Sequence, residues 1–413
     1  MTGTDKTGKN NAEKYILVGV SGNGRDDYSL DELAALLDTA GGEAVCRVIQ
    51  NLDSPDPSTY VGKGKADEIR NLVEMFEATG ILCDDELSPA QIRNLTDILD
   101  AKVIDRTILI LDIFASHAST NEGKIQVEMA QQKYRLSHLH GLGKALSRQG
   151  GGIGTRGPGE TRLESDRRRI QKRISVLTRS IAQMKRVRET NRKKRRNEGI
   201  PVIAVIGYTN AGKSTLLNTL TGAEVLAEDK LFATLDPTTR IFRLPGGRNI
   251  LMTDTVGFID KLPHNLIDAF RSTLEEVKYA DILLHVVDIS DPKDELHIKT
   301  VYETLGELDA GNKPVITVLN KTDRINSDEK ESLLFYKDPK AEHTVLVSAR
   351  TGEGLDELTE RIAGILSASQ ELTEVIIPYD NAGYLDVLRR RGCVIHEEYR
   401  DNGIFVKAYV PTA

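Results

Sequence analysis

The stretch Gly207-Tyr-Thr-Asn-Ala-Gly-Lys213-Ser214 decides the fold of the central part of this chain. It has the G-x-x-x-x-G-K-S pattern of a phosphate-binding loop (P-loop) and follows an apolar run, residues 202–206, typical of a buried parallel strand. Residues 214–220 resemble the first turns of a helix. In that setting the loop N–H groups and the helix N-terminus bind a phosphate chain. Lys213 would reach the β- and γ-phosphates, and the Ser214 hydroxyl would ligate Mg²⁺.

Three stretches further along the chain predict the rest of a guanine-nucleotide site. Asp254-Thr-Val-Gly257 ends a predicted strand, so its carboxylate would hold Mg²⁺ through water and its glycine N–H would contact a γ-phosphate. The carboxylate of Asn320-Lys-Thr-Asp323 can accept hydrogen bonds from guanine N1–H and N2–H, a pair that adenine lacks. Ser348-Ala349 can bond guanine O6 through backbone N–H groups. We therefore predict GTP rather than ATP as the ligand, and GTP hydrolysis to GDP.

A fourth stretch, Phe232-Ala-Thr-Leu-Asp236, lies where a switch loop is expected. Thr234 is the predicted second hydroxyl ligand of Mg²⁺, with Thr238 and Thr239 as alternatives that the sequence does not separate. We predict catalytic roles for Lys213, Thr234 and Gly257. The predicted GTP-binding residues are Gly207, Tyr208, Thr209, Asn210, Ala211, Gly212, Lys213, Ser214, Thr215, Phe232, Ala233, Thr234, Leu235, Asp236, Asp254, Thr255, Val256, Gly257, Asn320, Lys321, Thr322, Asp323, Ser348, Ala349 and Arg350.

Length and composition predict a soluble globular protein. The chain has 413 residues, enough for about three domains, and its hydrophobic and charged shares of 39% and 28% are typical of globular chains. We expect no signal peptide and no membrane span, since residues 1–14 are polar and no apolar run is long enough. Three widely spaced cysteines exclude a zinc pattern and indicate a reducing cytoplasm. We expect a monomer.

The alternation of strand and helix signals predicts four parts. These are an N-terminal α/β domain (1–118), an antiparallel helical hairpin with a glycine-rich tip (119–198), a P-loop GTPase domain with a doubly wound, mostly parallel sheet (199–367), and a small C-terminal β/α domain (368–413). In the first part, Ser29-Leu-Asp-Glu32 is predicted as a helix capping box. Tyr60-Val-Gly-Lys-Gly-Lys65 is either a flexible turn opening a helix or a phosphate- or RNA-binding loop.

The charge of the chain is distributed unevenly. Residues 162–196 contain 15 Lys and Arg against three acidic residues, a net charge of +12, so the remainder carries −19 against a total of −7. Such a basic arm on an acidic body favours a polyanionic partner. Within the arm, Ile170, Ile174, Leu177, Ile181 and Met184 recur at the spacing of a two-helix seam.

The predicted RNA-binding residues lie at the tip and the end of this hairpin. The tip, residues 149–159, has six glycines and one proline, which excludes a helix or strand. The alternative for the tip is a disordered linker, and the alternative for the basic run 192–196 is a solvated helix end. The predicted RNA contacts are Gly151, Gly152, Gly154, Arg156, Arg192, Lys193, Lys194, Arg195 and Arg196.

Together, GYTNAGKST, FATLD, DTVGF, NKTD and SAR, preceded by GGGIGTRGPGE and a basic helical hairpin, resemble the HflX family of ribosome-associated GTPases. The resemblance covers the chain from about Tyr15 to Leu366. It implies binding to the large ribosomal subunit and its rRNA near the peptidyl-transferase and tRNA-exit regions, and splitting or rescue of stalled ribosomes under stress. The alternatives are a ribosome-assembly GTPase and a GTP-gated signalling module with a protein partner.

Two positions bear on the chemistry. Phe258 follows Gly257, where Ras-type enzymes place the glutamine that orients the attacking water. Since a phenyl ring cannot bond water, either hydrolysis is slow or another group positions the water. Asn210 resembles the asparagine of Era- and TrmE-type GTPases that helps to hold K⁺, so K⁺ joins Mg²⁺ as an expected cofactor.

Overall fold

The computed structural model describes most of the chain. The described residues are 12–22, 27–146, 158–197, 200–222, 231–232, 237–245, 247–261, 276–368, 370–391 and 393–411. They divide into two compact units. The first contains 12–118 and 124–179, and the second contains 119–123 and the described residues from 180 onward. No helix among the described residues is long and apolar enough to cross a membrane.

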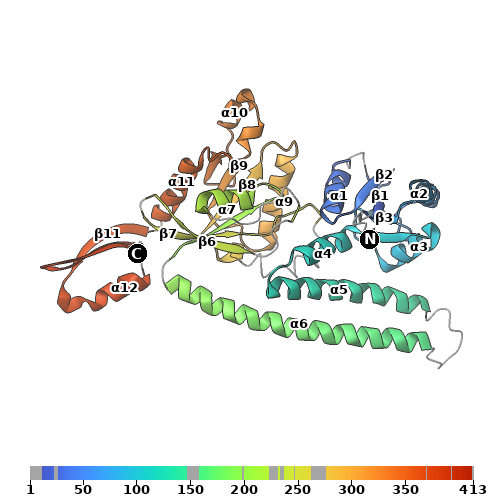
Figure 1. The fold of residues 1–413 in the computed structure, drawn as a ribbon, viewed down its shortest axis with the longest axis horizontal. Coiled ribbons are helices and arrows are strands. Elements are labelled where there is room, and N and C mark those ends of the chain that lie inside the picture. Colours follow the sequence, from blue (N-terminus) through green and yellow to red (C-terminus); the bar gives the residue numbers. More distant parts are fainter. Residues whose placement is uncertain are drawn as a thin grey trace, which may run out of the picture. The chain divides into compact units, whose positions relative to one another are not determined.

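The first unit is built on a parallel sheet with strand order β2-β1-β3-β4 (Figure 1). Its strands are β1 (Lys14–Ser21), β2 (Glu43–Asn51), β3 (Gly80–Cys83) and β4 (Lys102–Asp105). Its helices are α1 (Asp27–Thr39), α2 (Lys63–Phe76), α3 (Pro89–Leu99) and α4 (Arg106–His117). Ile16, Ile81 and Leu95 are fully buried in its core. The predicted N-terminal α/β architecture is confirmed.

The capping box predicted at Ser29–Glu32 is wrong. α1 already begins at Asp27, so Ser29 lies inside the helix. Its hydroxyl donates instead to Asp84, and Glu32 forms an ion pair with Arg106. Arg106 also pairs with Asp84 over 2.8 Å, and its side chain is 1% exposed. A buried guanidinium needs anionic partners, and this requirement outweighs a local cap.

Two helices, α5 (Asn121–Leu146) and α6 (Pro158–Asn197), form the predicted antiparallel hairpin. Glu128 of α5 pairs with Arg173 over 2.6 Å, whereas the earlier Glu122 pairs with the later Arg188 over 2.9 Å, which fixes opposite directions. Leu177 of the predicted seam is buried, and Ile170, Ile174, Ile181 and Met184 are half-buried.

The second unit contains the predicted doubly wound sheet, with order β10-β9-β8-β5-β7-β6. Among these strands β6 alone runs antiparallel, paired with β7. The strands are β5 (Val202–Gly207), β6 (Thr238–Arg243), β7 (Asn249–Asp254), β8 (Ile282–Asp288), β9 (Val315–Asn320) and β10 (His343–Leu346). The helices include α7 (Lys213–Thr221), α9 (Asp294–Glu307), α10 (Ser327–Leu333) and α11 (Leu355–Ala368). The carboxyl ends of β5, β7, β8 and β9 meet at one edge, where such sheets bind nucleotides.

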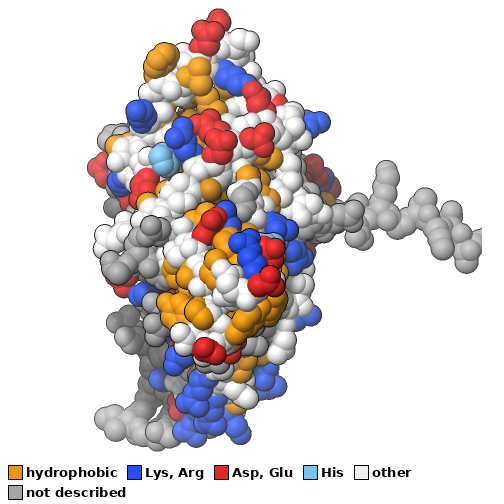
Figure 2. All heavy atoms as spheres, turned by 90° about the vertical axis from the view of Figure 1, so that its left-hand side faces the viewer, with side chains coloured by type: hydrophobic (Ala, Val, Ile, Leu, Met, Phe, Trp, Pro, Cys, Tyr) orange, Lys and Arg blue, Asp and Glu red, His pale blue; other side chains and the backbone are white. Residues whose placement is uncertain are grey.

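The C-terminal residues form a three-stranded antiparallel sheet with one helix, as predicted. The elements are β11 (Gln370–Ile377), α12 (Gly383–Arg391), β12 (Cys393–Arg400) and β13 (Gly403–Pro411), in the order β11-β13-β12. Ile377, Leu385 and Val406 form their core. Figure 2 looks toward this end of the molecule and shows hydrophobic side chains among charged ones on its surface. Leu372 and Ile376 of β11 are exposed.

Candidate nucleotide site

The P-loop joins the carboxyl end of β5 to the N-terminus of α7. Two of its glycines have no room for a side chain. A Cβ on Gly207 would lie 2.2 Å from the Val286 carbonyl oxygen, and one on Gly212 would lie 2.3 Å from Asn320 Nδ2. Gly212 also has a left-handed φ of +91°. The loop therefore packs directly on the ends of β8 and β9, and α7 begins where a phosphate chain would bind.

Lys213 lies buried over the loop. It is 7% exposed, and its Nζ donates a 2.7 Å hydrogen bond to the Tyr208 carbonyl oxygen. Burial lowers the pKa of this ammonium group to about 8, although the nearby Asp254 carboxylate favours the charged form. Phosphate oxygens would supply the anionic partner that the buried ammonium requires.

Ser214 and Asp254, the predicted Mg²⁺ residues, lie in contact. Ser214 Oγ donates to Asp254 Oδ2 over 2.6 Å. Thr255 Oγ1 donates to the Val205 carbonyl oxygen over 2.8 Å and so fastens the end of β7 to β5. A hydroxyl and a carboxylate are hard oxygen donors, and Mg²⁺ is usually held by one or two protein groups together with phosphates and water. This pair fits Mg²⁺.

Asn320 connects the P-loop with the predicted guanine site. Its Nδ2 donates to the Ala211 carbonyl oxygen over 2.8 Å, and its Oδ1 accepts from the Ala349 N–H over 2.9 Å. Ser348 Oγ donates to Asp323 Oδ1 over 2.7 Å. That hydrogen bond lowers the pKa of Asp323, whose exposed carboxylate is therefore ionised and able to accept guanine N–H groups.

The remaining residues of the predicted guanine site surround this contact. Lys321 has a left-handed φ of 67°, and its Nζ lies 2.6 Å from a carboxylate oxygen of Asp288 at the end of β8. Thr322 is buried and Arg350 is exposed. The sequence analysis missed Asp288, although an acidic residue that ends an apolar strand was a usable signal.

The ring of Phe258 points into the core. Phe258 is 2% exposed and packs in a cluster with Ile206 and Val277. Its backbone is paired with the P-loop, since its N–H donates to the Gly207 carbonyl oxygen over 3.1 Å and its carbonyl accepts from the Thr209 N–H over 2.8 Å. The ring therefore serves in packing. A group other than the Phe258 side chain would have to contact a water beside a bound γ-phosphate.

Tyr208 has partners that the sequence analysis also missed. Its ring stacks on His297 of α9 with centroids 3.8 Å apart, and its hydroxyl accepts from the Asp260 N–H over 2.7 Å. Burial lowers the pKa of His297, so the imidazole is favoured in its neutral form. These contacts fasten the outer side of the P-loop to α9.

The predicted switch stretch is only partly described. Phe232 is buried, whereas residues 233–236 (Ala233, Thr234, Leu235 and Asp236) lie outside the described residues. Thr239, one of the alternatives to Thr234, has its Oγ1 2.9 Å from Thr253 Oγ1 within the β6–β7 pair. The assignment of Thr234 to Mg²⁺ stays a prediction.

The predicted RNA contacts divide into three groups. Gly151, Gly152, Gly154 and Arg156 lie outside the described residues, as do the side chains of Lys194, Arg195 and Arg196. Lys193 is exposed. Arg192 instead forms an ion pair of 2.6 Å with Glu276 and is only 15% exposed. This ion pair already neutralises Arg192, and its assignment to RNA stays a prediction.

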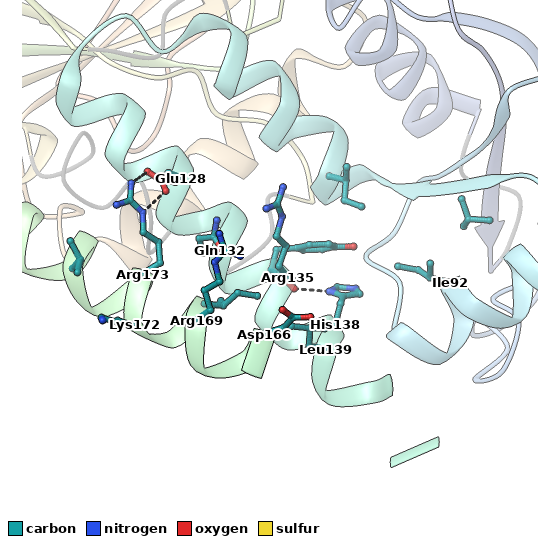
Figure 3. Close-up of a pocket in the computed structure, with 15 residues that line it drawn as sticks. Ile92, Glu128, Gln132, Arg135, His138, Leu139, Asp166, Arg169, Lys172 and Arg173 are labelled. Carbon is teal, nitrogen blue, oxygen red and sulfur yellow. Dashed lines mark hydrogen bonds and ion pairs between the residues drawn. The ribbon is translucent and has the colours of Figure 1, made fainter. Parts of the chain in front are cut away.

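Other cations of the hairpin line a groove of about 980 Å³ in the first unit (Figure 3). Arg173 is held there by two hydrogen bonds of 2.6 Å to Glu128. Arg135 from α5 and Arg169 and Lys172 from α6 are exposed and form no ion pair with any described residue. The sequence analysis missed Arg135, because only the fold brings it beside the basic helix.

Family comparisons cover most of the chain. Residues 27–115 match a family described as "GTP-binding GTPase N-terminal", residues 117–195 match "GTP-binding GTPase Middle Region", and residues 202–321 match "50S ribosome-binding GTPase". Among solved structures, the "crystal structure of SsGBP and GDP complex" matches with a TM-score of 0.47 and 27% identity, over 86% of this chain and 99% of that one.

Curated relatives match along nearly the whole length. The chain is 55% identical over 402 residues to "GTPase HflX" of Lacrimispora saccharolytica, covering 97% of this chain and 94% of the relative. It is 48% identical to that of Caldanaerobacter subterraneus subsp. tengcongensis, covering 96% and 91%. The identity to the Escherichia coli protein is 43%, covering 82% and 80%.

Proposed function

Since this chain belongs to the HflX family of GTPases, we propose that it binds the large ribosomal subunit in its GTP form and splits or rescues stalled ribosomes under stress. The observation that carries the proposal is a group of exposed cations on the helical hairpin, Arg135, Arg169 and Lys172, which form no ion pair with any residue that the structure describes. Such cations displace counterions from RNA phosphates. The match of residues 202–321 to a family described as ribosome-binding supports the same partner.

The chain binds and hydrolyses GTP, and its residues divide the work as follows. The P-loop N–H groups and Lys213 stabilise the charge that develops on the phosphate oxygens. Ser214 and Asp254 would hold Mg²⁺, which when bound neutralises charge on the β- and γ-phosphates. The Gly257 N–H faces the γ-phosphate. Asp323 selects guanine over adenine.

The attacking water needs an orienting group other than Phe258, whose ring is buried. We propose that the isolated chain hydrolyses GTP slowly and that large subunits accelerate it. Supplying a missing group gains roughly 10³–10⁵-fold in related switches. K⁺ bound with help from Asn210 is one further contribution. Comparing phosphate release in KCl with that in NaCl tests it, and equal rates would count against K⁺.

Two measurements test the ribosomal function. Pelleting with large subunits, in a GTP analogue and in GDP, should show binding that depends on the analogue; no pelleting in either state would favour a signalling module with a protein partner. Light scattering of intact ribosomes should then fall when the chain and GTP are added. Binding without dissociation would favour the ribosome-assembly function.

A further inference from the structure

Arg192 ties the last turns of α6 to the helical turn described at residues 276–279. Its Nη2 lies 2.6 Å from Glu276 Oε1, and its guanidinium carbon lies 4.1 Å from the centroid of the Tyr279 ring. The Arg192 and Glu276 side chains are only 15% and 14% exposed. A charge-assisted bond between two largely buried side chains holds more firmly than an exposed pair, and the cation–π contact adds to it.

The turn that holds Arg192 is packed on the residue that follows Gly257. Val277 and Ala280 are buried in the same cluster as Phe258. The turn is also fastened to the start of β5, because Asp281 Oδ2 accepts from the Val202 N–H over 2.8 Å. One close-packed cluster therefore contains both Phe258, which follows the predicted γ-phosphate contact Gly257, and Val277, which follows the Glu276 that holds α6. Such a cluster transmits displacements, because its side chains leave few voids to absorb them.

We propose that Arg192 is a positioning residue that couples the nucleotide state of the P-loop to the helical hairpin. A shift of Gly257 and Phe258 on binding a γ-phosphate displaces Val277, and with it the Glu276 carboxylate. Arg192 passes this displacement to α6. Because α6 is continuous over 40 residues, about 60 Å at 1.5 Å per residue, a small rotation at one end moves the other end much further. This proposal rests on the proposed ribosomal function only for the identity of the partner that the hairpin binds.

The first test needs no ribosome. Hydrogen–deuterium exchange of residues 180–197 in the full chain should differ between GDP and a non-hydrolysable GTP analogue. Arg192→Ala and the milder Glu276→Gln should both abolish that difference. The exchanged pair, Arg192→Glu with Glu276→Arg, should restore it, because the contact between the two side chains, and neither residue alone, carries the coupling. The matched control is Arg173→Ala, which breaks a different ion pair of the same helix and should keep the difference.

The outcomes are decisive in both directions. A nucleotide-dependent difference that survives in Arg192→Ala, or its absence in the wild type, would overturn the proposal. A second readout is the ratio of the affinities for the GTP analogue measured with and without large subunits. For coupled sites such a ratio is typically 5–150. We expect the ratio to fall toward one in Arg192→Ala and to persist in Arg173→Ala. If the wild type does not bind subunits, the ribosomal function fails, while the exchange experiment still decides the role of Arg192.

Discussion

The side-chain amide of Asn320 donates a 2.8 Å hydrogen bond to the main-chain carbonyl of Ala211 in the P-loop. The same side chain accepts a hydrogen bond from the Ala349 N–H, and Asn320 is 2% exposed. One buried residue thus fixes the distance between the P-loop and the loop at Ala349 that is predicted to bind the base.

Replacing Asn320 with alanine should weaken GTP and GDP binding together, by roughly 10–100-fold, since an unsatisfied buried polar group costs about 1–3 kcal/mol. Titration with fluorescent nucleotides measures both affinities. Asn326→Ala is the control, because Asn326 caps α10 away from the P-loop. Unchanged affinities in Asn320→Ala would show that the bridge is dispensable.

Asp323→Asn should redirect the preference from guanine toward xanthine nucleotides. The carboxylate would accept two hydrogen bonds from guanine, whereas an amide would present a donor to one of the two guanine N–H groups. We expect GTP affinity to fall by at least about 100-fold and XTP affinity to rise. Asp328→Asn, an exposed acid in α10, is the control. A variant that binds GTP as tightly as the wild type would refute the assignment of residues 320–323.

GTP affinity should fall as the pH rises above about 8, because burial lowers the pKa of Lys213 to that value. Between this pKa and the ordinary lysine pKa of 10.5, Lys213 is deprotonated in the folded chain but still protonated in the unfolded chain. The contribution of Lys213 to folding stability therefore increases with pH between about 8 and 10.5. Nucleotide titrations from pH 7 to 9.5, roughly spanning this pKa, measure the effect. Lys213→Arg should bind more weakly but without this pH dependence. Equal pH dependence in both proteins would contradict the prediction.

Phe258→Gln should destabilise the protein without restoring fast hydrolysis. The phenyl ring is buried, so the substitution places an amide in an apolar cluster and removes aromatic packing, at a cost of about 3–5 kcal/mol. Thermal unfolding and phosphate release are the measurements. Phe335→Gln, at a position 86% exposed, is the matched control and should leave the melting temperature unchanged. Faster hydrolysis in a normally stable Phe258→Gln would show that this position faces the water.

Replacing Arg135, Arg169 and Lys172 with alanine should flatten the salt dependence of binding to large subunits. Each neutralised phosphate contributes roughly −0.7 to −0.9 to the slope of log binding constant against log salt concentration. The slope of the triple variant should therefore be less negative by about two to three. GTP affinity should not change. Arg173→Ala is the control with the smaller expected effect, since Glu128 already neutralises Arg173. Pelleting assays at increasing KCl concentration provide the slopes. An unchanged slope in the triple variant would show that these cations contact solvent and not RNA.

The sequence by itself determined the P-loop and the order of the strands and helices around it, and it predicted the residues that would select guanine. These features are local, because a phosphate loop needs glycines at a fixed spacing before a helix, and strands and helices carry their own periodicities. The capping box that the structure has at the start of α3 is local in the same way, since the hydrogen bonds between Ser88 and Gln91 lie within one helical turn.

Only the tertiary structure decided where the charged and aromatic side chains found their partners. Ser29 resembled a cap, but it lies inside α1 because Arg106 and Asp84 are buried beside it. Arg192 resembled part of an RNA-binding run, yet it pairs with Glu276, 84 residues away in the sequence. Phe258 follows Gly257, the predicted γ-phosphate contact, but its ring packs in the core. A long charged side chain pairs with the group that best offsets the free-energy cost of its desolvation. That group can come from a distant part of the chain, so it is known only from the packed structure.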